Sequence, residues 1–247
     1  MTTILGASAS ALAHYQTVMD TIGHNVANIN SPAFRRTRTI SEGAPTTNTD
    51  PAQARLGVAQ STADLILSPG AALRDDNPLH FSIQDDAFFR VHDFDGSIAY
   101  TRMGGLDTDS AGNLTAFRGR FLEPPITVPQ GLTSLAISAN GTITGVAPDG
   151  SRQELGQLTL VHFLNPQGLR PMGDGLYAES VNSGAITEGV PGESGFAELI
   201  PGSLEGSNVD LAEEFTNMLI AQRAYSASAK TFSIGDQMLE LATNLTH

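Results

Sequence analysis

The residues best suited to metal chemistry in this 247-residue chain are its six histidines. None of them forms an HxxxH or HExxH pair, and His80, His92 and His162 fall in separate predicted strands. Histidines at a polar surface are a commoner outcome than three strand histidines meeting around zinc. The chain has no cysteine, which excludes thiolate metal sites, a cysteine nucleophile and disulfides. We therefore predict no metal site and no cofactor.

Two short motifs resemble ligand-binding loops. DTDSAGNL begins like a calcium loop at Asp107 and Asp109. However, Ala111 and Arg118 stand where oxygen ligands belong, so we predict a hairpin turn. GDGLYA, from Gly173, fits the letters of a dinucleotide fingerprint, but it runs into a predicted strand and does not open a helix. No catalytic, cofactor-binding or small-molecule site is predicted.

The charge of the chain limits its partners. The formal net charge is −13, which argues against a nucleic acid or an anionic membrane surface. The one basic cluster, Arg35, Arg36 and Arg38, is interpreted as a solvated turn, with contact to acidic residues of an adjacent subunit as the alternative. No stretch approaches the roughly 20 apolar residues that span a bilayer, and the first residues lack a basic region. We predict no membrane insertion and no cleaved Sec signal.

Proline and glycine divide the chain into three parts. All 13 prolines lie between Pro32 and Pro201, and glycine is rare at both ends. Because both residues interrupt helices, the ends are predicted as helices and the middle as turn-rich β structure. We predict an α+β fold with a helical unit formed by 1–30 paired with 206–247. Residues 31–75 are predicted as an extended arm and 76–205 as a β-rich outer domain.

Both ends carry apolar residues at a seven-residue spacing, which is typical of coiled coils. Broken only by Ser8, the opening rows contain Leu5, Leu12, Met19 and Val26, and Tyr15, Ile22 and Ile29. The closing rows contain Leu204, Leu211, Met218, Tyr225, Phe232 and Leu239, with Phe215 and Ala229 in the companion row. The period indicates that each helix packs against a partner helix along its length, although an ordinary amphipathic helix on its own domain remains an alternative.

Local signals place the elements in more detail. Ser207, three residues before Asp210, resembles a capping box, so a helix is predicted from about 208. In the middle, runs such as FFRVH, TITGV and QLTLVHFL read as strands. The dipeptides Asp95-Gly96, Asn140-Gly141 and Asp149-Gly150 accept the positive φ of tight turns. The middle is therefore predicted to be antiparallel.

Both ends also resemble a known family. HNVANINSPAF is similar to the N-N-x-A-N-x-x-T-x-G-F signature of bacterial flagellar rod and hook proteins. EGSNVDLAEEFTNMLIAQRAYSASAKTFSIGDQMLELATNL resembles the C-terminal segment of the same family. The chain departs from the pattern at His24, Ala33 and Ser228, and Ala33 in place of glycine predicts a stiffer turn. The matching signature positions are Asn25, Ala27, Asn28, Phe34, Ser207, Asn208, Gln222, Arg223 and Tyr225.

The resemblance implies a structural rod subunit that polymerises through its terminal helices into a hollow drive shaft, which transmits torque and carries an export channel. It implies a location in the flagellar basal body, with copies of the chain, neighbouring rod or hook proteins and the export apparatus as partners. The implied subunit contacts are Leu5, Leu12, Tyr15, Met19, Ile22, Val26, Ile29, Leu211, Phe215, Met218, Tyr225, Phe232 and Leu239.

Two alternatives remain at this stage. One is a hook or other axial subunit of the same family, because the short spacer resembles a proximal rod protein and the C-terminal half a distal rod or hook protein. The other is a β-domain protein that binds or hydrolyses carbohydrate and dimerises through helical arms. Ordered helices in the free protein and a deep pocket would favour the second.

Overall fold

The computed structural model describes residues 2–43, 58–193 and 195–244. Within these ranges the chain forms two compact units. The first unit, called the helical unit below, contains residues 2–29, 36–43, 58–66 and 209–244. The second, called the β unit, contains residues 30–35, 67–193 and 195–208. Residues 44–57 of the predicted arm lie outside the described part of the chain.

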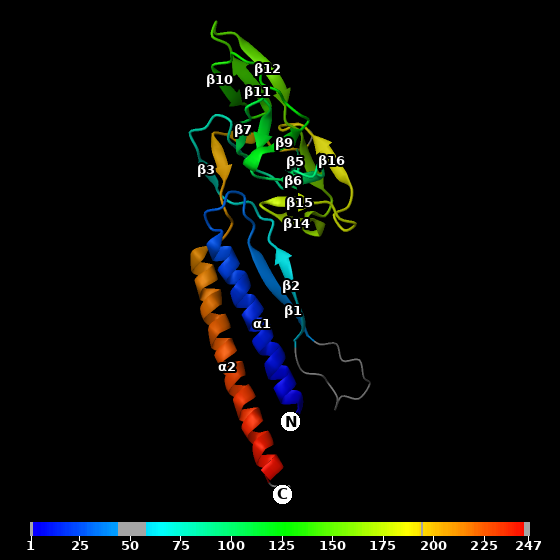
Figure 1. Cartoon of the computed structure of the whole chain (residues 1–247), viewed down its shortest axis with the longest axis vertical. Helices are drawn as coiled ribbons and strands as arrows, with labels where there is room; N and C mark the ends of the chain where they lie inside the picture. The colour runs from blue at the N-terminus through cyan, green and yellow to red at the C-terminus, as the bar shows by residue number, and fades with distance from the viewer. Residues whose placement is uncertain (1, 44–57, 194, 245–247) are drawn as a thin grey trace. The chain divides into compact units, whose positions relative to one another are not determined.

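The helical unit is built on two helices, α1 (Thr2–Ala27) and α2 (Leu211–Asn244). They lie side by side in Figure 1. Helices at both ends are thus confirmed, while their coiled-coil pairing stays a prediction. Neither helix, over its described residues, is long and apolar enough to cross a bilayer.

The C-terminal end of α1 and the N-terminal end of α2 each differ from their predicted positions by a few residues. Ile29 lies beyond α1, which ends at Ala27 in a turn where the Asn28 N–H donates to the Asn25 carbonyl at 3.1 Å. At the other end, Asp210 and not Ser207 caps α2. Its Oδ1 accepts the N–H groups of Ala212 at 2.8 Å and Glu213 at 3.2 Å. Asp210 is the correct cap because its oxygen reaches the second and third N–H groups of the helix, which have no partner inside it.

A two-stranded antiparallel ribbon completes the helical unit. It pairs β1 (Thr37–Gly43) with β2 (Val58–Leu65), with a bulge at Glu42 and Gly43. Both strands pack beside α1. The predicted arm over 31–75 did not include this ribbon, because TRTISEG and VAQSTADL lack a clear alternation of apolar and polar residues.

The β unit is dominated by one antiparallel sheet of nine strands. Its strands are β14 (Arg170–Gly173), β15 (Leu176–Ala178), β6 (Ile98–Thr101), β5 (Phe88–His92), β9 (Arg120–Glu123), β8 (Leu114–Ala116), β7 (Leu106–Thr108), β13 (Leu160–Phe163) and β16 (Ile186–Gly189). β13 and β16 form a branch from β5, and the strand pairs of this sheet are antiparallel. The antiparallel β-rich middle is therefore confirmed.

Smaller sheets and turns surround it. They comprise the three-stranded sheet β10 (Ser134–Ile137), β11 (Thr142–Val146) and β12 (Arg152–Gln157), and the pairs β17 (Leu199–Pro201) with β4 (Phe81–Ile83) and β18 (Ser203–Glu205) with β3 (Ala72–Arg74). Two 3-10 turns occupy Phe117–Gly119 and Pro166–Gly168. The three predicted tight turns are confirmed, since Gly96, Gly141 and Gly150 all have positive φ.

The core of the β unit lies on the inward face of the large sheet. Alternate residues of β5, Phe89 and Val91, are almost fully buried. They join a cluster to which most strands of the β unit contribute, including Phe81, Leu106, Leu114, Leu122, Ile143 and Leu160. The period of two along each strand puts these side chains on one face. The β unit thus has a hydrophobic core of its own.

Candidate assembly interface

The seam between α1 and α2 is formed by a row of small and polar side chains. On α2, Glu214 and Ala221 are buried, and Ser228 and Gly235 are half-buried at the same seven-residue spacing. The predicted companion row began one position later, at Phe215, whose side chain is 52% exposed. The row from Glu214 to Gly235 is more buried than the row from Phe215 because its smaller side chains let the two helices approach closely. In the other predicted row of α2, Met218 and Leu239 are half-buried, whereas Leu211, Tyr225 and Phe232 are exposed.

Asn25 joins three elements of the helical unit. It is 1% exposed, and its side-chain amide exchanges two hydrogen bonds with the backbone of Thr37 at the start of β1, at 2.8 and 3.0 Å. Its Nδ2 also donates to Oε1 of Glu214 on α2 at 3.1 Å. Only an amide side chain can both donate and accept in this way. This explains an asparagine at this position of the signature.

Glu214 is a carboxylate in the seam. Burial raises the pKa of Glu214 above its ordinary value, while the hydrogen bond from Asn25 and the charge of Arg36 lower it. Arg36 Nη1 lies 4.0 Å from Glu214 and 2.7 Å from Glu213 Oε2. The first turn of α2 therefore carries two carboxylates beside one arginine.

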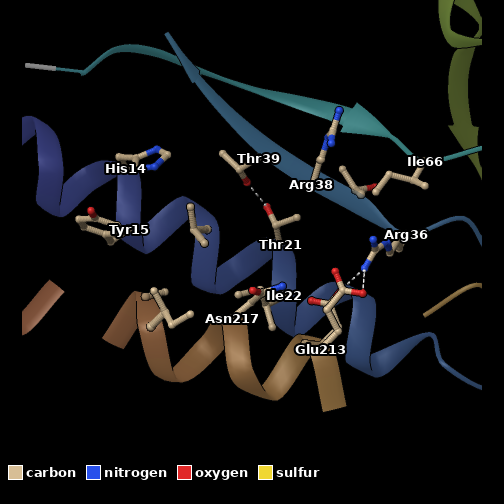
Figure 2. A pocket seen from close by; sticks show the side chains of 15 residues that line it. His14, Tyr15, Thr21, Ile22, Arg36, Arg38, Thr39, Ile66, Glu213 and Asn217 are labelled. Atoms are coloured by element: carbon tan, nitrogen blue, oxygen red, sulfur yellow. Dashed lines mark hydrogen bonds and ion pairs between the residues drawn. The ribbon is translucent and has the colours of Figure 1, made fainter. Parts of the chain in front are cut away.

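A groove of about 370 Å³ opens beside this junction, lined by α1, β1 and the first three turns of α2. Figure 2 shows Tyr15, Ile22 and Ile66 lining it together with Asn217. A water molecule takes about 30 Å³, so the groove has room for several side chains.

The polar groups that line the groove are largely paired within the chain. His14 Nδ1 lies 2.8 Å from Ser61 Oγ, and the hydroxyls of Thr21 and Thr39 lie 2.9 Å apart. Arg38 contacts Asp64 at 2.8 Å, in addition to the pair formed by Arg36. What the groove leaves to a partner is mainly its apolar surface.

α2 exposes many large apolar side chains. Their exposed fractions run from 37% to 64% in Leu211, Phe215, Leu219, Ile220, Tyr225, Phe232, Ile234, Met238 and Leu241. Among them, Ile234, Met238 and Leu241 lie on one face of the helix, and monomeric proteins rarely leave large contiguous apolar patches uncovered. The arrangement is suited to binding another protein surface.

The predicted subunit contacts are distributed over both helices. Ile22 is buried, and half-buried positions are Leu5, Leu12, Tyr15, Met19, Val26, Ile29, Met218 and Leu239. The exposed positions are Leu211, Phe215, Tyr225 and Phe232. Their role between subunits stays a prediction.

The remaining signature residues lie at the helix ends and on α2. Asn28 donates its side-chain N–H to the His24 carbonyl at 2.9 Å, and the Phe34 carbonyl accepts the Asn208 N–H at 3.3 Å. Ala27 closes α1, Ser207 is half-buried, and Gln222 and Arg223 are exposed on α2. The signature thus combines structural turns with exposed helix positions.

Arg35, the first member of the basic cluster, is not solvated, so the interpretation as a solvated turn was wrong for this residue. In the β unit Arg35 Nη2 bonds Glu205 Oε1, and both side chains are almost fully buried. Arg102 donates to the same carboxylate at 3.0 and 3.4 Å and to the carbonyls of Ala87 and Ile83 at 2.6 and 3.2 Å. Burial lowers the pKa of Arg102, against the charge of Glu205. Sequence reasoning missed this triad because its members are distant along the chain and no spacing links them.

Ala33 adopts the left-handed conformation, with φ of 53°. Its N–H donates to the Glu205 carbonyl at 2.7 Å, and the residue is 3% exposed. A side chain in this region costs energy that glycine avoids. The positive φ makes Ala33 a strained position, while the stiffer turn predicted from this residue stays a prediction.

The strand histidines lie apart, each with its own carboxylate. His80 Nδ1 is 3.0 Å from Asp75, and His162 Nε2 is 3.1 Å from Asp85. The third, His92, lies 3.4 Å from a carboxylate oxygen of Glu123. Across the described ranges, no group of three or more His, Cys, Asp or Glu side chains could hold a metal ion.

Two family models match the sequence. Residues 82–145 match the flagellar hook protein FlgE/F/G D1 domain, and residues 200–245 match the flagellar basal body rod FlgEFG protein C-terminal region. The first range covers part of the β unit, and the second covers the end of the β unit and α2.

Curated relatives match over nearly the whole length. The chain is 34% identical to the flagellar basal-body rod protein FlgG of Bacillus subtilis, covering 96% of each. It is 34% identical to the protein of the same name from Caulobacter vibrioides, covering 98% of each. Similarity to the flagellar hook protein FlgE of Borreliella burgdorferi, 43% identical, covers 42% of this chain and 24% of that one.

Proposed function

Because the chain belongs to the flagellar basal-body rod protein family, we propose that it polymerises through its terminal helices into the hollow shaft of the basal body. It is a structural subunit of the rod. In this proposal the shaft transmits torque and encloses an export channel. The relatives that match over nearly the full length are named as rod proteins, and the hook match covers less than half of this chain.

The observation that carries the proposal is the exposed apolar surface of α2. Hydrophobic burial contributes roughly 25 cal/mol for each Å² of apolar surface removed from water, so side chains such as Leu219 and Leu241 gain when a neighbour covers them. α2 has 34 residues and is about 51 Å long at 1.5 Å per residue. Exposed apolar side chains along a helix of this length can pack against the helices of neighbouring subunits.

The sequence also supports the proposed partners. A chain without cysteine has no thiol to oxidise as it moves between compartments. We propose export through the flagellar apparatus and contact with copies of itself and neighbouring axial proteins. A carbohydrate-binding or hydrolytic function has no support from the relatives.

A matched pair of substitutions on α2 tests the proposal. Ile234 and Ser233 are both exposed, but consecutive residues of a helix point about 100° apart. Ile234→Glu puts a charge into the apolar face, and we expect loss of rods in isolated basal bodies and loss of swimming. Ser233→Glu adds the same charge about 100° away from the apolar group formed by Ile234, Met238 and Leu241, and should leave both intact. Normal rods with Ile234→Glu would contradict the proposal.

A further inference from the structure

The helical unit has two apolar features, a groove and, elsewhere on α2, a stripe of exposed side chains that could fill such a groove. One is the groove beside α1, whose apolar lining includes Tyr15 and Val18. The other is a stripe on the second half of α2 formed by Ile234, Met238 and Leu241, which are 53%, 51% and 64% exposed. Residues at positions i, i+4 and i+7 lie on one face of a helix, so these three side chains project together.

The groove requires an apolar occupant. Its threonine hydroxyls already contact each other, and His14, Arg36 and Arg38 have partners in the chain. A polar ligand would therefore gain few new hydrogen bonds there. Side chains that fill the space against Tyr15 and Val18 would instead remove apolar surface from water.

Charge also matches between the two features. Lys230 lies one turn before Ile234 on the same face of α2. Glu213 lines the groove, and its side chain is 50% exposed despite its pair with Arg36. A lysine next to the stripe can approach this carboxylate when the stripe enters the groove.

The two features lie too far apart to meet within one chain. On α2 the groove is lined by residues from Glu213 to Ala221, whereas Met238 lies 17 residues beyond Ala221. At 1.5 Å per residue this is about 25 Å along the helix. A contact between a stripe and a groove must therefore join two copies, and each copy keeps one free groove and one free stripe. Such a contact is heterologous and extends into an open assembly.

We propose that the groove of one subunit receives Ile234, Met238 and Leu241 of a second copy. The inference rests on the proposed rod function and assigns the socket and the inserted side chains of one subunit joint. It predicts that successive copies are displaced along the direction of α2, so that the second half of one helix lies beside the first half of the next.

The absence of cysteine allows a direct test in assembled rods. Val18→Cys places a thiol in the groove and Met238→Cys places one in the stripe, and the double variant is expressed in cells that lack the native chain. After oxidation of isolated basal bodies, a head-to-tail joint should give a ladder of covalent multimers on a non-reducing gel. A closed two-fold contact would give dimers only and would overturn the inference.

The matched control pairs Val18→Cys with Ser233→Cys, an exposed position on a different face of α2, and should give no ladder. If cells with the double variant swim but their basal bodies give no ladder, the inference is overturned and the rod function is left intact. Normal rods with Ile234→Glu would instead refute the helix-mediated assembly itself. As a test without cysteines, Val18→Trp fills the groove and should abolish rods while the purified chain keeps its circular dichroism; normal rods would overturn the inference.

Discussion

Glu205 carries the most informative stability prediction. Two arginines share its carboxylate inside the β unit, with side-chain exposures of 0% for Arg35, 2% for Arg102 and 1% for Glu205. Glu205→Gln preserves the size of the side chain and removes the negative charge. Both guanidinium groups then remain buried without a counter-charge.

The expected loss is large. Removing one partner of a buried ion pair costs about 3–5 kcal/mol, because the remaining charge stays desolvated. Arg35→Met breaks the same contact but leaves Arg102 paired with Glu205. Since Nε and Nη1 of Arg35 have no hydrogen-bond partner among the described residues, we expect this variant to lose at least about 2 kcal/mol less than Glu205→Gln.

Urea unfolding of the purified chain, followed by circular dichroism of the β unit, measures these differences. Asp174→Asn is the matched control, because Asp174 is 44% exposed and pairs with Arg118, which is 55% exposed, while its second neighbour Arg120, 3.6 Å away, keeps its own contact with Asp93. Exposed pairs contribute about 0–1 kcal/mol. Equal losses for Glu205→Gln and Asp174→Asn, or for Glu205→Gln and Arg35→Met, would refute the reasoning that the buried charge balance stabilises this unit.

Three further predictions concern other elements. Asp210→Ala removes the cap of α2 and should cost about 1 kcal/mol, measured as lost helical dichroism on heating, whereas an unchanged melting curve would contradict the cap. Ala33→Gly relieves a positive φ and should change the unfolding free energy by less than about 1 kcal/mol, while Ala99→Gly in the core should cost about 1.5 kcal/mol; a larger loss at Ala33 would be inconsistent with the strain. Because burial raises the pKa of Glu214, its protonated form favours the folded state, so stability should rise as pH falls from neutral towards the ordinary glutamate range. Glu214→Gln should flatten this dependence in urea titrations across that window, and parallel curves would argue against it.

Local physics explains what could be predicted from the sequence. Proline and glycine are incompatible with helix interiors, so their distribution separated two terminal helices from a turn-rich middle. The Asp-Gly and Asn-Gly pairs placed hairpin turns correctly, since positive φ is a property of the residues themselves. The period of a helix placed Leu211, Phe215, Tyr225 and Phe232 in the predicted rows of α2, but the rows did not contain the exposed residues Leu219, Ile220, Ile234, Met238 and Leu241.

The tertiary structure decided the contacts between distant residues. Nothing near Arg35 in the sequence indicates that it is buried against Glu205, or that Asn25 bonds the backbone of Thr37 and the side chain of Glu214. The ribbon of β1 and β2 was also missed, because its pairing depends on packing beside α1 more than on its own composition. Spacing along the chain reports which face of an element a residue occupies, whereas the partner of that face depends on how the whole chain folds.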